Sequence, residues 1–375
     1  MYNRTFRILF AFCPLFVILF LCLGCGGSPK IQNSICSACE FVYATTNSAQ
    51  ILTFPIDRLT GSLGAPISIA GPANSGGLVT LAPANVAYQV YLYASDPQDG
   101  AIHVYRVHMV DGTLAPASVG PFPLGNGFGT PGEMAAFGNV IYVVNSTGSI
   151  FAFTENADGS LTSVPGSPFA AGAGASHLTA NGAFLYAANS NDPSGSISAF
   201  SIAANGALVP VPGSPFPTLS GAGPEGISGG GAFLYVALKN ANAVAAFAVA
   251  SDGSLSPITG SPFPAGRGTF SLSRANQFLF ATNNLDGTIS SYTVDPISGI
   301  LTQVAGSPFP GAVTSGDTTY FNGNLFVPNA TSNSISVFQT DNPSLGAVSP
   351  MMGSPFQAGA SPVALTTAGF PAVDP

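Results

Sequence analysis

Short runs of apolar residues, separated by Gly, Asn, Asp and Pro, recur along most of the chain. One unit shows the pattern in full: Phe184–Ala188 is continuously apolar, and Ser196–Ile202 alternates polar and apolar positions. A short continuous run predicts a buried strand, and strict alternation predicts a half-buried strand. Two shorter runs, 177–180 and 208–211, complete four predicted strands, which are joined by turns containing Asn-Gly.

This four-stranded unit repeats along the chain. The phrase Gly-Ser-Pro-Phe recurs at intervals of 46 or 47 residues, and two related phrases precede it, which gives seven copies. A period of this length is typical of β-propeller blades. A second phrase, an apolar run centred near an aromatic residue, recurs with the same period. The copies of the first phrase begin at Gly64, Val119, Gly166, Gly213, Gly260, Gly306 and Gly353, and the aromatic residues of the second are Tyr43, Tyr93, Tyr142, Tyr186, Tyr235, Phe280 and Phe326.

The two ends of the repeat region are out of phase with the blades. Glu40–Thr45 has the pattern of a second strand with no first strand before it, and Ser361–Thr366 has that of a first strand with no second after it. Pairing the two would complete one blade and close the ring without a free edge. The sequence therefore predicts an all-β, seven-bladed β-propeller with four antiparallel strands per blade, spanning residues 40–368, and a tail at 369–375.

The N-terminal segment predicts export. Arg4 and Arg7 precede the apolar run Ile8–Leu23, as in a secretory signal. The run ends at Cys22-Leu-Gly-Cys25, which resembles a bacterial lipobox, where Gly or Ala precedes the Cys that becomes lipid-modified. We expect residues 1–25 to be a lipoprotein-type signal ending at Cys25, with the protein held at the cell envelope only by this lipid anchor. Cys22 stands where a lipobox usually has Leu, so an ordinary cleaved signal or an uncleaved anchor is the alternative.

Residues 26–39 read as a flexible tether that carries two cysteines. Cys36 and Cys39 form a Cys-x-x-Cys pair in what would be an oxidising compartment. The pair could be a small structural disulfide or a redox site, and we favour the structural reading because no thioredoxin-like pattern surrounds it. The two further ligands that a zinc site needs are not nearby.

Charge is scarce, and this excludes some functions. Only 6% of the residues are charged, and outside the signal segment six basic residues face sixteen acidic ones. Nucleic-acid binding needs clustered Lys and Arg, which the chain lacks, and phosphorylated substrates are disfavoured for the same reason. There is no nucleotide loop, no Gly-x-Ser-x-Gly elbow and no Cys/His nucleophile pair. We expect no cofactor, no metal, no nucleic-acid partner and a monomer.

Residues 40–367 resemble the lactonase family of seven-bladed propellers, which includes bacterial 6-phosphogluconolactonases and fungal muconate-lactonizing enzymes. They also resemble the propeller repeats with Tyr-Val-Thr-Asn signatures of surface proteins. The resemblance rests on the strands Phe184–Asn189 and Phe278–Asn283 and on the Gly-Ser-Pro-Phe crossings. It implies a propeller that hydrolyses a lactone, although packing and turn residues specify a fold better than an activity.

Candidate site residues follow from aligning the units on the second-strand aromatic, because the loops before first strands and after second strands line one mouth of a propeller. Nine or ten residues before that aromatic, where the first strand starts, several polar residues stand at one structural level. Clustered carboxylates can raise one another's pKa, and a nearby His can act as a general base. We expect His177 as base with Glu225 and Glu133 as acid or polar partners; candidate ligand-binding residues are Asp317, Ser176, Ser271, Arg267, Asn189 and Asn283.

The family often has Arg-His or Pro-His at the start of a first strand, and His177 matches the His of that pair. The Arg is missing, because Ser176 precedes His177. The basic residue closest in sequence to a mouth position is Arg267, four residues before Ser271. A neutral lactone therefore suits the site better than an anionic one. The alternative function is a non-catalytic envelope propeller that binds a carbohydrate or a protein partner through its mouth or faces.

Several candidates also have plain structural readings. An isolated His or Glu at a strand start can be an ordinary turn or solvated residue, and Asn189 and Asn283 can simply shape turns. The loop from Asp96 to Gly100 offers two carboxylates, fewer than Ca²⁺ requires. His103 and His108 are read as surface residues.

Overall fold

The computed structural model describes residues 40–73, 75–81, 89–124, 131–145, 147–311, 316–340 and 346–370. All belong to the compact unit Cys36–Pro375. Every regular element in these residues is a strand, and no helix among them is long and apolar enough to cross a membrane. The predicted signal, the lipidation residue Cys25, the tether with Cys36 and Cys39, and the last five residues of the tail lie outside the described residues.

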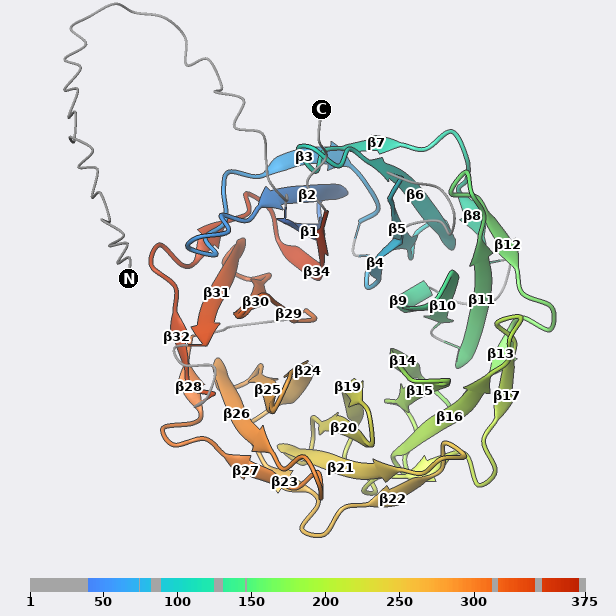
Figure 1. The fold of residues 1–375 in the computed structure, drawn as a ribbon, viewed down its shortest axis with the longest axis vertical. Coiled ribbons are helices and arrows are strands. Elements are labelled where there is room, and N and C mark those ends of the chain that lie inside the picture. Colours follow the sequence, from blue (N-terminus) through green and yellow to red (C-terminus); the bar gives the residue numbers. More distant parts are fainter. Residues whose placement is uncertain are drawn as a thin grey trace, which may run out of the picture. The chain divides into compact units, whose positions relative to one another are not determined.

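Seven sheets are arranged around a centre as the blades of a propeller, which confirms the predicted fold (Figure 1). The innermost strands are β4 (Leu78–Leu81), β9 (Pro131–Phe137), β14 (Ala175–Asn181), β19 (Pro224–Gly230), β24 (Thr269–Ala275), β29 (Thr319–Phe321) and β34 (Pro362–Gly369). The second strands are β1 (Glu40–Thr46), β5 (Tyr91–Asp96), β10 (Val140–Asn145), β15 (Phe184–Asn189), β20 (Phe233–Leu238), β25 (Phe278–Asn283) and β30 (Asn324–Asn329).

The third strands are β2 (Gln50–Pro55), β6 (Ala101–Val107), β11 (Ser149–Glu155), β16 (Ser196–Ile202), β21 (Ala243–Val249), β26 (Thr288–Val294) and β31 (Ser334–Thr340). The outer strands are β3 (Ile67–Ala70), β7 (Leu114–Pro116), β12 (Leu161–Ser163), β17 (Leu208–Pro210), β22 (Leu255–Pro257), β27 (Leu301–Gln303) and β32 (Val348–Pro350). We number the blades by their inner strands: blade 1 contains β34, and blades 2 to 7 begin with β4, β9, β14, β19, β24 and β29.

The ring closes through the two ends of the repeat region, as the sequence predicts. β34 pairs antiparallel with β1, with Phe41 opposite Ala368 and Tyr43 opposite Thr366. Blade 1 is therefore built from both ends of the chain, in the order β3-β2-β1-β34. The inner edge of β1 is therefore paired and is not open to another chain.

The Gly-Ser-Pro-Phe crossings form short extra strands that the sequence analysis missed. They are β8 (Phe122–Pro123), β13 (Phe169–Ala170), β18 (Phe216–Pro217), β23 (Phe263–Pro264), β28 (Phe309–Pro310) and β33 (Phe356–Gln357). Each pairs with the start of the third strand, while the outer strand pairs with its end. Between the two, the crossing Ser accepts a hydrogen bond from a third-strand N–H, for example Ala199 N to Ser214 Oγ at 2.9 Å. The repeated Ser thus satisfies an amide that neither outer segment reaches.

A buried tyrosine in most second strands fixes each blade to the next. The hydroxyl of Tyr186, which is fully buried, donates to the carbonyl of Gly253 at 3.0 Å, in the turn between the third and outer strands of the following blade. Gly253 has φ +84°, and a Cβ there would lie 2.3 Å from the ring of Phe184, so the turn requires glycine. The same bond joins Tyr43 to Gly112, Tyr93 to Gly159, Tyr142 to Gly206 and Tyr235 to Gly299.

Removing one of these hydroxyls should destabilise the ring. We expect Tyr186→Phe to lower the free energy of unfolding by about 1–2 kcal/mol, because the carbonyl of Gly253 is left buried without its donor. Urea denaturation of the two proteins measures the difference. Ser201→Ala is the control, since it removes an exposed side-chain hydrogen bond to Val209 and should change stability by no more than about 0.5 kcal/mol. Equal stability of Tyr186→Phe and the wild type would contradict this role.

Candidate functional site

Four charged side chains meet at the inner strands. Glu133 lies on β9, His177 on β14 and Glu225 on β19, which belong to the consecutive blades 3, 4 and 5, and Asp317 lies two residues before β29 of blade 7. We call these four residues the channel cluster. Neighbouring inner strands approach closely: a Cβ on Gly226 would lie 2.4 Å from the carbonyl oxygen of Phe270 on β24. In a chain with 6% charged residues, the cluster is a local concentration of charge.

His177 is the centre of the cluster. Its Nε2 lies 3.3 Å from Asp317 Oδ1, and its Nδ1 lies 2.9 Å from Ser176 Oγ and 3.6 Å from Glu225 Oε2. The ring packs edge-on against Phe270, with centroids 5.6 Å apart. Only 7% of His177 is exposed, so the imidazole is fixed by its neighbours and not by solvent. Asp317 and His177 come from blades that are not adjacent, so this ion pair connects different sides of the ring.

Glu133 approaches the cluster from the other side. Its Oε2 accepts a hydrogen bond from the backbone N–H of Leu178 at 2.6 Å. Burial raises the pKa of Glu133 well above its usual range, and the nearby carboxylate of Asp317 raises it further, while His177 and the Leu178 N–H act in the opposite direction. A carboxyl group with a raised pKa can hold a proton near neutral pH and can donate it.

The surroundings of His177 favour its charged form. Burial by itself lowers the pKa of His177, but the carboxylates of Asp317, Glu133 and Glu225 outweigh it and raise the pKa to about 10. An imidazole with such a pKa is protonated at neutral pH and cannot accept a proton. The role of general base that the sequence suggested for His177 is therefore not supported by its environment; an imidazolium that stabilises negative charge fits better.

Glu225 connects the cluster to the surface. Its Oε2 accepts hydrogen bonds from Ser190 at 3.1 Å and from Ser176 at 3.5 Å, and its Oε1 lies 3.4 Å from the ammonium of Lys239. The hydroxyls of Ser176 and Ser190 contact each other, and Ser190 also lies 2.8 Å from the carbonyl of Pro224. A chain of polar contacts thus runs from His177 through Ser176 and Ser190 to the carboxylate of Glu225.

A cavity of about 320 Å³ opens beside this chain of contacts. Its volume is at the lower end of the range for small-molecule sites. Glu225 and the hydroxyl-bearing residues reach the cavity wall, whereas His177, Glu133 and Asp317 lie behind it. Its lining consists of Pro131, Gly132, Asn145, Gly174, Ala175, Ser176, Ser190, Asn191 and Glu225.

Two predicted ligand-binding residues are buried in the blades and are corrected here. Asn189 is fully buried, and its Nδ2 donates to Ser196 at 2.8 Å and to Ser198 at 3.1 Å. Asn283 is likewise fully buried and donates to hydroxyls of β26. Neither can contact a ligand. They hold the second strand to the third through bonds between side chains, which is a structural role but not the shaping of a turn.

Ser271 and Arg267 also lie apart from the channel cluster. Ser271 is 3% exposed, and its hydroxyl accepts the N–H of Thr318 at 3.0 Å, which fixes the residue next to Asp317. It is therefore a positioning residue at most. The backbone N–H of Arg267 donates to Asp286, and its guanidinium, which is 71% exposed, lies 4.0 Å from the same side chain.

The sequence analysis missed Ser190, Lys239 and Phe270 as members of the site. Ser190 and Lys239 stand four residues after the alignment aromatics Tyr186 and Tyr235, directly after the second strand. The loops after second strands were expected to line the mouth, but the candidates Asn189 and Asn283 are the last residues of their second strands. Taking the residue one position later would have included Ser190 and Lys239. Lys239 also lies 5.4 Å from the ring centroid of Phe270, which a hydrophobic pattern cannot indicate.

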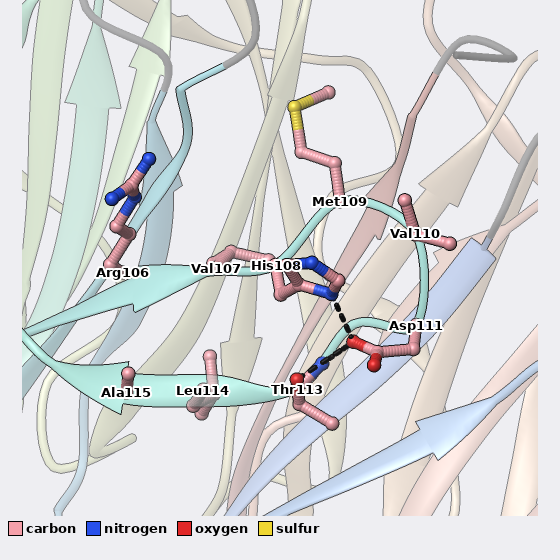
Figure 2. A pocket seen from close by; sticks show the side chains of 9 residues that line it. All are labelled: Arg106, Val107, His108, Met109, Val110, Asp111, Thr113, Leu114 and Ala115. Atoms are coloured by element: carbon pink, nitrogen blue, oxygen red, sulfur yellow. Dashed lines mark hydrogen bonds and ion pairs between the residues drawn. The ribbon is translucent and has the colours of Figure 1, made fainter. Parts of the chain in front are cut away.

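A larger hollow of about 610 Å³ lies on the β6–β7 hairpin, outside the inner strands (Figure 2). His108 Nδ1 lies 2.8 Å from Asp111 Oδ1, which also accepts bonds from the N–H and hydroxyl of Thr113. Both His108 and Asp111 are more than half exposed, as expected of surface residues. These contacts close a turn, and no charged group from another blade joins them among the contacts of the described residues.

Comparison with known proteins supports the propeller and its lactonase-like character. Residues 219–314 match the family model described as Lactonase, 7-bladed beta-propeller. The matched segment contains Glu225, Lys239 and Phe270, but neither His177 nor Glu133. A search of curated proteins finds no relative that matches the chain.

Solved structures extend the likeness to most of the chain. A periplasmic gluconolactonase from Pseudomonas aeruginosa is 20% identical with a TM-score of 0.69, and 88% of this chain covers 99% of that one. A provisionally assigned 6-phosphogluconolactonase from Bacteroides uniformis is 20% identical with a TM-score of 0.72, covering 88% and 100% of the two chains. Another provisionally assigned 6-phosphogluconolactonase, from Bacteroides fragilis, is 20% identical with a TM-score of 0.69, and 91% of this chain covers 100% of that one. The resemblance to seven-bladed lactonase-type propellers is thus confirmed; at this identity the structures establish the fold.

The channel cluster should make stability fall at alkaline pH. His177 binds its proton more tightly in the folded protein than in the unfolded chain, so its contribution is fully present below about pH 6.5. It is lost as the pH rises through about 10. The raised pKa of Glu133 acts in the same direction.

We expect the free energy of unfolding of the wild type to decline over this range and that of His177→Gln to decline less. Urea denaturation at several pH values measures the two slopes. His108→Gln is the control, because it removes an exposed His from the β6–β7 hairpin and should keep the wild-type slope. A His177→Gln slope equal to that of the wild type would refute the charge assignment.

Proposed function

We propose that this propeller is an exported lactonase-type hydrolase that opens a small, uncharged lactone at the mouth of its channel. The observation that carries the proposal is the convergence of Ser176, Ser190 and Glu225 on one cavity, with His177 and its carboxylate partners directly behind them. Buried groups with shifted pKa values beside a cavity are typical of active sites.

The cavity favours an uncharged substrate. The polar side chains on its wall are hydroxyls, amides and the carboxylate of Glu225, and no Arg or Lys is among the residues that line it. Lys239 contacts the wall residue Glu225, but its charge is paired with that carboxylate and it lies over the ring of Phe270. A phosphorylated lactone would meet Glu225 without a matching guanidinium, so we propose a neutral sugar or aryl lactone as the substrate class.

The proposed reaction is hydrolysis of the lactone ester bond. Glu225 takes a proton from a water molecule as the water oxygen bonds to the lactone carbonyl carbon. The carbonyl oxygen becomes an oxyanion, and the hydroxyl of Ser176 donates a hydrogen bond to it. Collapse of this intermediate breaks the bond between the carbonyl carbon and the ring oxygen. The proton on Glu225 then passes to that oxygen, so the products are a hydroxy acid and the unchanged enzyme.

His177 supports this reaction from behind Ser176. Its Nδ1 lies 2.9 Å from Ser176 Oγ, so an imidazolium there donates to the serine oxygen and polarises the hydroxyl. The carboxylate of Asp317, 3.3 Å from Nε2, contributes most to holding the imidazole in its charged form. We therefore propose His177 as an electrostatic residue and Glu225 as the base, which reverses the roles that the sequence suggested.

A hydrolysis assay tests this mechanism. We expect the wild type to open neutral sugar or aryl lactones faster than buffer alone, measured by acid release at constant pH, and to prefer them over a phosphorylated lactone. Glu225→Gln should lower kcat/KM by at least about 100-fold, since it removes the base. Ser176→Ala should lower kcat with little change in KM, because its bond forms in the transition state.

His108→Gln is the control and should keep wild-type activity. Equal rates for the wild type and Glu225→Gln would exclude the mechanism. One feature favours the non-catalytic alternative: the polar atoms of the cluster already satisfy one another, and His177 is almost fully buried. Binding of a neutral sugar that Glu225→Gln weakens, without hydrolysis of any lactone, would support a carbohydrate-binding propeller instead.

The proposal includes export with a lipid anchor at Cys25. It is supported by the basic residues and apolar run of the first 25 residues and by the periplasmic location named for the Pseudomonas aeruginosa relative. An enzyme placed there would act on lactones outside the cytoplasm.

Lipidation can be tested directly. When the full chain is expressed in a bacterial host fed labelled palmitate, we expect label on the protein and recovery of the protein with membranes. Cys25→Ser should lose the label, whereas Cys22→Ser should keep it, because only Cys25 follows the Leu-Gly pair. Label that persists in Cys25→Ser would show that another residue carries the lipid, and a wild type without label would refute the lipid anchor.

A further inference from the structure

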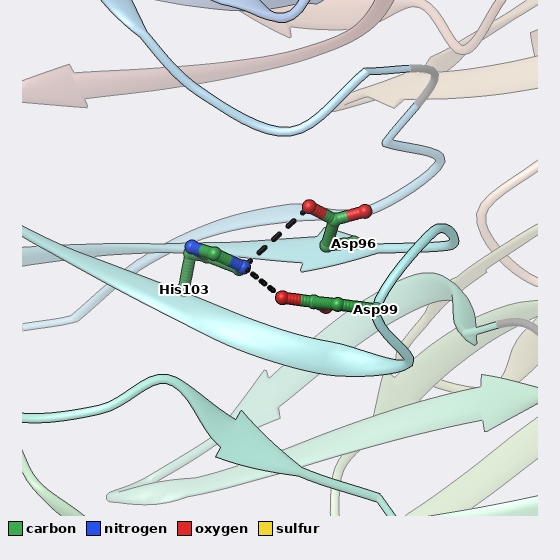
Figure 3. A group of neighbouring side chains, drawn as sticks. All are labelled: Asp96, Asp99 and His103. Atoms are coloured by element: carbon green, nitrogen blue, oxygen red, sulfur yellow. Dashed lines mark hydrogen bonds and ion pairs between the residues drawn. The ribbon is translucent and has the colours of Figure 1, made fainter.

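A second group of charged side chains lies on blade 2, on different strands from the channel cluster. Asp96 ends β5, Asp99 stands in the following turn, and His103 lies on β6 (Figure 3). One ligand atom from each of the three lies within 4.8 Å of the others. All three side chains are at least partly accessible, with exposures of 13%, 43% and 28%, so an ion from solvent can reach them.

Backbone hydrogen bonds in the turn orient the carboxylates of Asp96 and Asp99 toward His103. Asp96 Oδ1 accepts the N–H of Gln98 at 2.8 Å, and Asp99 Oδ1 accepts the N–H of Ala101 at 3.0 Å. Each carboxylate is thereby oriented by the turn, and its other oxygen faces His103. The Oδ2 atoms of Asp96 and Asp99 lie 3.5 Å and 2.7 Å from His103 Nε2.

The strand register places Asp96 and His103 on the same face of the hairpin. Asp96 is opposite Ala101, and His103 is opposite Ala94, so the two are diagonal neighbours. Both facing residues are alanines, whose short side chains do not separate Asp96 from His103. Within the described part of the chain, the ion pairs of the two carboxylates involve His103 and no Lys or Arg.

Comparison among blades shows that Asp96 and His103 replace a neutral pair. In blade 4, Asn189 and Ser198 stand at the positions of Asp96 and His103, and Asn189 donates to Ser198 at 3.1 Å. In blade 2, Asp stands in place of the Asn and His in place of the Ser. The other arrangement holds the same two strands together without charge, so packing of the blade does not require the charged version.

We propose that Asp96, Asp99 and His103 bind a divalent first-row transition-metal ion, represented by Zn²⁺. One imidazole nitrogen and two carboxylate oxygens are common zinc ligands, and a site with three protein ligands leaves a fourth position for water. Zinc–ligand distances of about 2.0–2.1 Å place neighbouring tetrahedral ligands about 3.3 Å apart. His103 Nε2 lies 3.5 Å from Asp96 Oδ2, which is close to this separation, and 2.7 Å from Asp99 Oδ2, so an ion requires these two atoms to move apart.

The nitrogen ligand decides the class of ion. Ca²⁺ and Mg²⁺ select sites made of oxygen ligands, whereas imidazole suits Zn²⁺, Cu²⁺ and Ni²⁺. A bound ion would tie the end of β5 to β6 and would neutralise the two carboxylates. This inference does not depend on the proposed hydrolysis, because none of the three residues belongs to the channel cluster.

Titration of the untagged full chain with Zn²⁺ tests the proposal. We expect isothermal titration calorimetry to detect a site that His103→Ser weakens by at least about tenfold, since one of three ligands is lost. The double variant Asp96→Asn with His103→Ser rebuilds the arrangement of blade 4. It should fold with wild-type stability in the absence of metal and lose the site completely.

His108→Ser is the matched control, because His108 is an exposed histidine of the same blade that also lies 2.8 Å from an Asp. It should bind Zn²⁺ as the wild type does. Zinc binding that is absent in the wild type, unchanged in the double variant, or lost in His108→Ser would overturn the proposal. Any zinc bound at Cys36 and Cys39 would persist in the double variant and would be counted separately.

Discussion

Closure of the ring is the constraint on which the site depends. β34 and β1 come from opposite ends of the chain, and their pairing fixes blade 7 beside blade 1. The channel cluster takes its residues from blades 3, 4, 5 and 7, so the distance from His177 to Asp317 is set by the whole ring and not by one hairpin. The Tyr-to-Gly hydrogen bonds between successive blades maintain the same spacing, and each adds a small stabilisation to a contact that is repeated around the ring.

The cluster also needs an explanation in terms of energy. Burying an imidazolium among carboxylates costs desolvation, which the mutual attraction only partly offsets, and apolar residues of similar size are often as stable. This chain otherwise avoids charge, and its blades pack through apolar and hydroxyl side chains. A group of four ionisable residues beside a cavity, with His177 buried among three partly buried carboxyl groups, is therefore better explained by chemistry than by folding, which is the physical basis of the proposed hydrolase.

The repeats made most of the fold predictable, because two phrases at one period locate the strands and the turn residues. They also placed Glu133, His177, Glu225 and Asp317 at one structural level. The contacts among these residues could not be predicted, since the pair of His177 with Asp317 joins non-adjacent blades, and the raised pKa of His177 depends on three carboxylates at once. Asn189 and Asn283 were misassigned because the strand pattern gives burial of a face, but not the hydroxyl partners on β16 and β26 that consume their amides.

Internal repetition also gives a standard against which single blades can be judged. The Asn-to-Ser bond between second and third strands recurs in blades 4, 6 and 7, so its residues are explained by packing alone. Blade 2 departs from this standard, because Asp96 and His103 stand where these three blades have the hydrogen-bonded Asn and Ser. A bound cation would stabilise these charged side chains, whereas the neutral pair needs none. The same comparison distinguishes the first-strand positions, where blades 3, 4, 5 and 7 carry Glu, His, Glu and Asp, whereas blade 6 has the uncharged Phe270 and Ser271. In a repeat protein, function is most readily recognised where one copy carries chemistry that the others do without.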